Sequence, residues 1–151
     1  MSTVLVAIHV YLVMLLNKDV KATNMKEFLN IAKNSPAGKL NYSSWGVGGM
    51  AHLAAELFNI EAKIKLTHIP YKGSPEAVTG VISGQTEATF QGMTVALPHI
   101  NSGRLRPIAI AAPARVKDAP NIPTMAEVGL PGVKIDTWFG VFLPPETPKS
   151  I

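Results

Sequence analysis

Three segments of this sequence share one arrangement: a short apolar stretch, then a loop of small or polar residues, then a stretch with helical spacing. The loops lie at 43–49, 71–75 and 91–94. Strands that alternate with helices pack as a mostly parallel sheet flanked by helices, so the pattern predicts an α/β fold. Ligands of such sheets bind beyond the carboxyl ends of the strands. We therefore expect the three loops to lie on one edge and to form half of a cleft.

The remaining elements follow from apolar periodicity and from turn residues. Asn24 is expected to cap one helix and Ser74 another, and Thr124 with Glu127 predicts a third, short helix closed by Gly129. Pro107 within a strand indicates an edge position or a bulge. The predicted strands cover 4–16 (one buried strand or a pair), 40–43, 64–69, 87–90, 105–112 and 135–143, and the predicted helices cover 25–32, 50–59, 74–83, 95–102 and the segment after 124.

The first of the three loops has the composition of an anion-binding turn. Asn41–Phe58 reads as a short strand, a Ser/Gly loop and an amphipathic helix, with glycines at 46, 48 and 49. Glycine allows close approach of the backbone, and the start of a helix presents unpaired amides and partial positive charge. The loop therefore predicts a seat for a carboxylate or a phosphate, although the same sequence also suits a plain turn.

Composition excludes several functional classes. The chain has 151 residues, no cysteine and a net charge of +4 that is scattered rather than clustered, which argues for one globular domain and against nucleic-acid binding. Among possible metal ligands only His52 and Glu56 have helical spacing, so no metal site is expected. No nucleotide-binding or nucleophile-elbow motif is present, and we expect neither a catalytic residue nor a cofactor.

Several residues near the loops are candidates for ligand contact. Tyr71 and Lys72 follow a strand and could hold or cover a polar ligand, or could simply lie on the rim. Trp45 could stack on a ligand, anchor a second domain or be an exposed rim residue. Trp138 is expected in the core, with its neighbour Phe139.

The order of five blocks resembles the tripartite tricarboxylate transporter receptors, the Bug-type periplasmic solute-binding proteins. The resemblance spans nearly the whole chain. The blocks are YSSWGVGGMAHLAAELF from Tyr42, HIPYKGS from His68, ALPHINSGRLRPIAI from Ala96, IPTMAEVGLPG from Ile122 and TWFGVFLPPETPKSI from Thr137.

The resemblance implies one lobe of a type II periplasmic-binding-protein-like fold, from a family whose members are roughly twice this long. It assigns 1–16 to a hinge or crossing-strand region, 17–143 to the ligand-binding lobe with a return strand at 135–143, and 144–151 to a Pro-rich tail. It also implies a periplasmic location, a small carboxylate or dicarboxylate ligand and a membrane transporter as partner.

The ligand-binding residues expected from the loops and the resemblance together are Ser44, Trp45, Gly46, Val47, Gly48, Gly49, Tyr71, Gly73, Ser74 and Gln91. Three of them depart from the family pattern. Gly49 replaces a Ser or Thr, Gln91 replaces a carboxylate, and Trp45 replaces a small residue, so an aromatic or bulky acid is conceivable. With one lobe only, we expect weak ligand binding or none.

Two alternatives remain open at this stage. One is an α/β enzyme that binds an anionic substrate at the Ser/Gly loop, for which His52 and Glu87 are the candidate bases. The other is an interaction module in which exposed hinge strands pair between two chains to give a homodimer.

Overall fold

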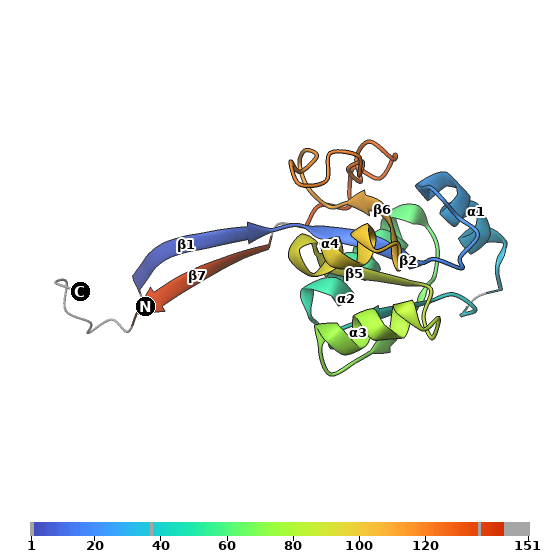
Figure 1. The fold of residues 1–151 in the computed structure, drawn as a ribbon, viewed down its shortest axis with the longest axis horizontal. Coiled ribbons are helices and arrows are strands. Elements are labelled where there is room, and N and C mark those ends of the chain that lie inside the picture. Colours follow the sequence, from blue (N-terminus) through green and yellow to red (C-terminus); the bar gives the residue numbers. More distant parts are fainter. Residues whose placement is uncertain (1, 37, 136, 144–151) are drawn as a thin grey trace.

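The computed structural model describes residues 2–36, 38–135 and 137–143. A five-stranded sheet with helices on both faces forms the body, and a two-stranded ribbon projects from it (Figure 1). The strands are β1 (Ser2–Val10), β2 (Leu12–Asn17), β3 (Asn41–Ser44), β4 (Thr67–Pro70), β5 (Ala88–Gly92), β6 (Leu105–Ile110) and β7 (Thr137–Leu143). The helices are α1 (Met25–Asn34), α2 (Met50–Ala62), α3 (Ser74–Ile82) and α4 (Met93–Asn101).

The body sheet has the order β4-β3-β5-β2-β6. β3 runs parallel to β4 and β5, while β2 runs antiparallel to both of its neighbours, β5 and β6. Four of the five strands therefore point in one direction. The expected α/β fold with a mostly parallel sheet is confirmed, and its antiparallel member is the strand nearest the start of the chain.

The first apolar run forms two strands that belong to different sheets. β1 pairs only with β7, from Ser2 opposite Leu143 to Val10 opposite Thr137. After Tyr11 the chain continues as β2 at the interior of the body sheet. The ribbon and the body are thus joined by one almost continuous extended segment, as Figure 1 shows.

Side chains of β2 alternate between two hydrophobic cores. Leu12, Met14 and Leu16 pack in a core that contains Phe28 of α1 and Phe58 of α2. Val13 and Leu15 pack in the second core, with side chains of α3 and α4. Because successive strand residues face opposite sides, an apolar run without alternation predicts a strand covered on both faces. That is the situation of β2, whose six residues are all buried.

Helix ends differ in how their first amides are satisfied. Asn24 caps α1 as expected, because its side chain accepts a hydrogen bond from the amide of Glu27 at 3.0 Å. Ser74 was wrongly expected to cap α3: Gly73 is the N-cap, and Ser74 is the first helical residue. α2 is the longest described helix at 13 residues, and none in the described ranges is both long and apolar enough to cross a membrane.

Pro107 lies on an edge strand and beside a bulge, so both readings of this residue are correct. β6 is the last strand of the sheet order. Leu15 pairs with Pro107 while Met14 pairs with Ala109, which leaves Ile108 as the extra residue. A proline has no amide to donate, and it is tolerated here because only one side of β6 has a partner strand.

The short helix expected after Thr124 does not form. The capping-box hydrogen bonds are present, since Thr124 N donates to Glu127 Oε2 at 2.7 Å and Glu127 N donates to Thr124 Oγ1 at 3.2 Å. These bonds close turns instead of a helix because Gly129 and Pro131 follow within a few residues. The hydrogen bonds from Arg115 and Thr124 lower the pKa of Glu127 to about 2.

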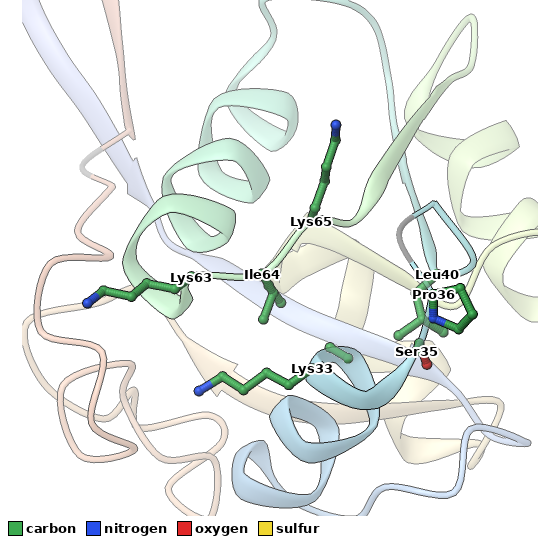
Figure 2. Close-up of a pocket in the computed structure, with 8 residues that line it drawn as sticks. Lys33, Ser35, Pro36, Leu40, Lys63, Ile64 and Lys65 are labelled. Carbon is green, nitrogen blue, oxygen red and sulfur yellow. The ribbon is translucent and has the colours of Figure 1, made fainter.

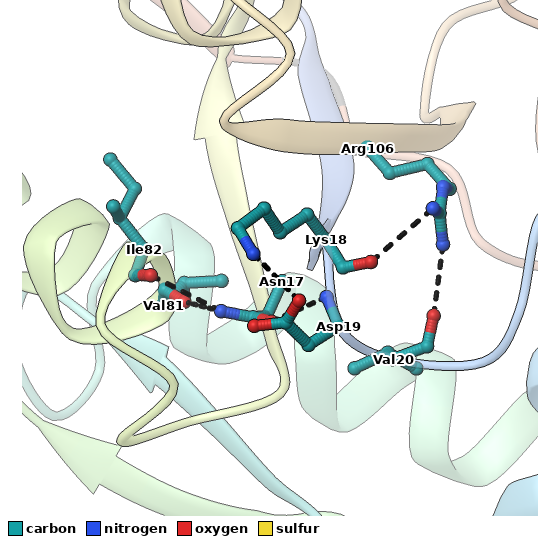
Figure 3. A network of polar contacts seen from close by, with 7 residues as sticks. All are labelled: Asn17, Lys18, Asp19, Val20, Val81, Ile82 and Arg106. Atoms are coloured by element: carbon teal, nitrogen blue, oxygen red, sulfur yellow. Dashed lines mark hydrogen bonds and ion pairs between the residues drawn. The ribbon is translucent and has the colours of Figure 1, made fainter.

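A polar network fixes the end of β2 that lies away from the ribbon (Figure 3). The buried Asn17 donates to the carbonyls of Val81 and Ile82 at the end of α3. Arg106 of β6 donates to the carbonyl of Val20 at 2.9 Å and to that of Ala22 at 2.6 Å. The side chains thereby connect β2 and β6 to carbonyls at a helix end and in a turn.

Candidate functional site

A cleft of about 700 Å³ lies where the ribbon meets the body. One wall comes from the ribbon and the start of β2, and the other from the first residues of three helices. The lining residues are Val10, Leu12, Trp45, Gly49, Met50, Ser74, Gln91, Gly92, Thr94, Val95, Thr137 and Trp138. The described lining contains no charged side chain.

Three helix N-termini converge on this cleft, and each has a glycine as its N-cap. The N-caps are Gly49 of α2, Gly73 of α3 and Gly92 of α4, and none of these helices has a side-chain cap. α1, which contributes nothing to the lining, is capped by Asn24. The first amide of α4, that of Met93, donates to the carbonyl of Tyr11. The partial positive charge of the three helix starts nevertheless makes this end of the sheet suited to an anion.

The glycine loop supports the start of α2 rather than offering all of its own amides. Gly46 and Gly48 have φ of 131° and 78°, which only glycine adopts without strain. The amide of Gly46 donates to Ser44 Oγ, that of Gly48 to His52 Nδ1, and that of Gly49 to the carbonyl of Gly46. The donors that face a ligand are therefore those of the first turn of α2, which begins at Met50.

Ser44 lies beneath the glycine loop and is fully buried. Its Oγ is 3.0 Å from the carbonyl oxygen of Gly46, to which it donates, and 2.7 Å from Nε2 of His68. The side chain thus fixes the loop from below. It is not among the residues that line the cleft.

Gln91 forms the floor of the cleft and belongs to a directed chain of hydrogen bonds. Ser74 Oγ donates to Gln91 Oε1 at 2.7 Å, Gln91 Nε2 donates to Thr89 Oγ1, and Thr89 donates to the carbonyl of Ser43. Gln91 and Thr89 are fully buried. The chain orients Ser74, the first residue of α3, at the wall of the cleft.

Of the ten expected ligand-binding residues, the structure brings four to the cleft lining: Trp45, Gly49, Ser74 and Gln91. Gly73 caps the helix that bears Ser74, and Val47 is 78% exposed at the tip of the loop. Tyr71 points elsewhere, because its hydroxyl donates to Gln85 at 2.9 Å and its ring packs against Gly80 of α3.

Several lining residues were missed from the sequence. Thr94 falls in the segment 91–94 that was expected to be a loop, so the pattern gave a usable signal for it, although β5 passes directly into α4 there. Trp138 was wrongly expected in the core, because it is 48% exposed and lines the cleft. Thr137 Oγ1 is buried without a hydrogen-bond partner in the described part of the chain. No sequence pattern distinguishes the ribbon residues that reach the cleft.

The family model of the tripartite tricarboxylate transporter family receptor matches residues 2–151. The chain belongs to this receptor family. The receptor BugT of Bordetella pertussis is 35% identical over 140 residues, which cover 93% of this chain and 43% of BugT. Family members are periplasmic solute-binding receptors rather than enzymes.

Solved structures of receptors in this family have the same fold. A protein of R. palustris solved with adipate superimposes with a TM-score of 0.92 at 28% identity, covering 99% of this chain and 50% of the other. MatC from Rhodopseudomonas palustris, solved with bound malate, gives a TM-score of 0.89 at 26% identity, with 98% and 50% covered. The chain spans about half the length of the relatives that it matches.

Two histidines of the receptor chain stack beneath the glycine loop. The ring centroids of His52 and His68 are 4.2 Å apart, and His68 also stacks on Tyr42 at 4.9 Å. The Tyr42 hydroxyl donates to Glu56 Oε1 at 2.6 Å. Burial, and then the neighbouring His52, lower the pKa of His68, while Glu56 opposes this shift. A neutral His68 is thus favoured beside Ser44.

A second pocket, of about 390 Å³, lies at the C-terminal ends of α1 and α2 (Figure 2). Lys33, Lys63 and Lys65 line it, with Lys33 in the last turn of α1 and Lys63 as the C-cap of α2. Cations are favourable at helix C-termini, which explains these lysines without a ligand. This receptor therefore offers neutral donors at the cleft and cations at the far end of the body. Across the described residues, no three His, Asp or Glu side chains are grouped to hold a metal ion.

Proposed function

We propose that this chain supplies one lobe of a periplasmic receptor that binds the carboxylate of a small organic acid in the cleft between ribbon and body. The observation that carries the proposal is the convergence of the starts of α2, α3 and α4 on one cleft, each capped only by glycine. Each start presents roughly half of a positive charge. Together they favour an anion without a cationic side chain.

The unequal surroundings of the three helix starts indicate where the carboxylate lies. Glu76 occupies the first turn of α3, beside Gly73, and partly offsets the positive end of that helix. α2 and α4 have no acidic residue in their first turns. We therefore place the carboxylate nearest Met50 and Thr94, which both line the cleft. The structural relatives solved with adipate and malate support an organic acid as the ligand class.

In this proposal the ligand bridges two lobes and stabilises a closed form that a membrane transporter recognises. The ribbon of β1 and β7 is the connection along which such closure occurs. Because one lobe supplies only part of the ligand contacts, the chain alone binds weakly, and submicromolar binding of a simple dicarboxylate would contradict this view.

The arrangement favours a receptor over an enzyme. Glu87, a candidate base, lies away from the cleft, where its carboxylate accepts a hydrogen bond from the amide of Asn41 at the start of β3. Ser44 contacts His68 but is fully buried. Neither group is among the residues that line the cleft, and neither is His52, the other candidate base.

A homodimer through the ribbon is a second candidate role. Among the described strands, β1 and β7 pair only with each other, so each has one unpaired edge. Unpaired edges are templates for strand addition from another chain. Light scattering coupled to size exclusion tests this role, and a monomer at about 100 μM protein would exclude it.

The proposed anion site is tested with Thr94→Asp, which places a carboxylate in the first turn of α4 at the cleft. The matched control is Asn24→Asp, which places the same charge at the start of α1, away from the cleft. We expect adipate affinity, measured by NMR titration at millimolar ligand, to fall at least about tenfold in the first variant only. Equal affinities in both variants would contradict the proposed site.

A further inference from the structure

Two tryptophans line the cleft, one from each wall. Trp45 follows β3 in the body and Trp138 lies on β7 of the ribbon. They are the two tryptophans of the chain. From their position, and resting on the proposed carboxylate site, we infer that the cleft selects acids whose carboxylate is attached to a flat aromatic ring.

The Trp45 side chain lines the cleft, and its N–H lies beside the residue that caps α2. Its side chain packs on the larger core, and the Nε1 edge lies against Gly49, where a Cβ atom would be 3.4 Å from Nε1. The described residues provide no hydrogen-bond acceptor for this N–H. An indole donor thus lies beside the start of α2, where the carboxylate is placed.

The remainder of the lining suits an apolar ligand body. Four of its side chains are aliphatic or thioether groups, and the polar ones are neutral. The apolar residues besides the tryptophans are Val10, Leu12, Met50 and Val95, and the polar side chains are Ser74, Gln91, Thr94 and Thr137. A second carboxylate would find no cation in the described lining. A ring attached directly to the first carboxylate would lie against Trp45 and extend toward Trp138.

The expected selectivity is modest because the aromatic contact adds only a fraction of the binding free energy. Aromatic pairs contribute enough beyond buried area to change an affinity by about two- to tenfold. Benzoate and cyclohexanecarboxylate are suitable probes, because they share the carboxylate and the ring size and differ in planarity. Adipate serves as the open-chain reference.

The test is an NMR titration of the whole chain with the three acids, following the two indole N–H signals. Trp45→Phe and Trp138→Phe assign these signals. We expect benzoate to bind about two- to tenfold more tightly than cyclohexanecarboxylate. Trp45→Leu should remove this preference, whereas Trp45→Phe should retain most of it because it keeps a flat ring. Both variants lose the indole N–H, so their affinities for adipate should be the same.

Each outcome decides between the inference and the function on which it rests. If adipate binds but benzoate and cyclohexanecarboxylate bind equally, the inference is overturned and the carboxylate site stands. If no acid binds at 20 mM, a limit on the order of the weakest useful affinities, both fail. If Trp45→Leu does not fold, Trp138→Leu provides the same test, because Trp138 is half-exposed. If this variant still binds benzoate more tightly than cyclohexanecarboxylate by the wild-type ratio, the proposed ring position is contradicted.

Discussion

His52 and His68 stack with their ring centroids 4.2 Å apart, and each is connected to the glycine loop. His52 Nδ1 accepts from the amide of Gly48 at 3.1 Å, and His68 Nε2 is 2.7 Å from Ser44 Oγ. A protonated Nδ1 could not accept this bond, and two charged rings at this spacing would repel each other. The hydrogen bond from Gly48 to His52 therefore requires a free lone pair on Nδ1.

Stability should fall at mildly acidic pH because of His68. Burial and His52 lower its pKa in the folded state below the ordinary value of 6.5. Above pH 6.5 the ring is neutral in both states, whereas below it the unfolded chain takes up the proton first. The free energy of unfolding therefore decreases as the pH falls from about 6.5 toward the lowered pKa.

Urea unfolding of the wild type and His68→Gln between pH 5 and 7.5, a window of about one unit on either side of the ordinary histidine pKa, measures this effect. The variant should show a smaller loss of stability on acidification. His99→Gln measures the separate contribution of a second histidine, whose pKa is lowered by burial and then by Arg104. An identical pH slope in the wild type and His68→Gln would refute the assignment.

His52→Leu should loosen the glycine loop without unfolding the body. The substitution removes the acceptor of the Gly48 amide, so hydrogen exchange at Gly48 should accelerate. The amide of Gly103, which donates to the carbonyl of Ile100, provides a reference at the end of α4. Acceleration at both amides would indicate general destabilisation instead of a local effect.

The hydroxyl of Tyr42 should contribute far more to stability than that of Tyr71. Tyr42 is fully buried and donates to the Glu56 carboxylate at 2.6 Å, and burial and Glu56 raise its pKa, so it remains a donor. Tyr42→Phe should cost about 1.5–3 kcal/mol, as expected for a hydrogen bond to a charged group.

Tyr71→Phe is the matched variant, because its hydroxyl donates to Gln85 at an exposed position. It should change stability by less than about 0.5 kcal/mol. Denaturant midpoints of the two variants provide the comparison, and equal losses would show that the Tyr42–Glu56 bond has no special weight.

Gly48→Ala and Gly103→Ala should be equally destabilising but differ in ligand binding. Both glycines have positive φ, 78° and 68°, and an added Cβ would meet nothing within 4 Å at either site. The strain of the left-handed conformation should cost each variant about 1–2 kcal/mol. Only Gly48 belongs to the loop that precedes α2, so only Gly48→Ala should weaken adipate binding by NMR. Loss of binding in both variants would point to global effects.

Lys63 has φ of 53° at the C-cap of α2, a conformation that favours glycine or asparagine. Lys63→Gly should raise the melting temperature, because relief of about 1–2 kcal/mol of left-handed strain exceeds the entropic cost of glycine, about 0.5–1 kcal/mol. Lys65→Gly is the control, because Lys65 is not among the residues with positive φ. A lower melting temperature for Lys63→Gly would show that the lysine side chain compensates its backbone strain.

The sequence allowed much of the body to be predicted, for local reasons. The strand–loop–helix units around β3, β4 and β5 follow from loops of small residues and from helical spacing. The direction of β2 was not predictable in this way, because an apolar run has the same appearance whether it runs with or against its neighbours. Thr124 and Glu127 show a similar limit: their hydrogen bonds formed as expected, yet Gly129 and Pro131 prevented a helix.

Only the wall of the cleft that the body contributes was predicted from the sequence. Gly49 and Ser74 follow strands of the body and Gln91 lies near the carboxyl end of β5, so the rule for sheet edges locates them. Thr137 and Trp138 reach the same cleft from a strand near the other end of the chain. Their position depends on the pairing of β7 with β1, a long-range contact that no local pattern encodes. The contact of Tyr71 with Gln85, which lies beyond α3, is likewise not encoded by a local pattern.

The pairing of Val10 with Thr137 brings the entry and the exit of the body to the same point, and the ribbon extends from there to Ser2 and Leu143. The body is therefore held by the two-stranded ribbon of β1 and β7 (Figure 1). The body can consequently be exchanged between relatives, or grafted into a host loop, with little distortion of either chain. A pair of fluorophores, one on the ribbon of β1 and β7 and one on the body, would report bending of the ribbon relative to the body.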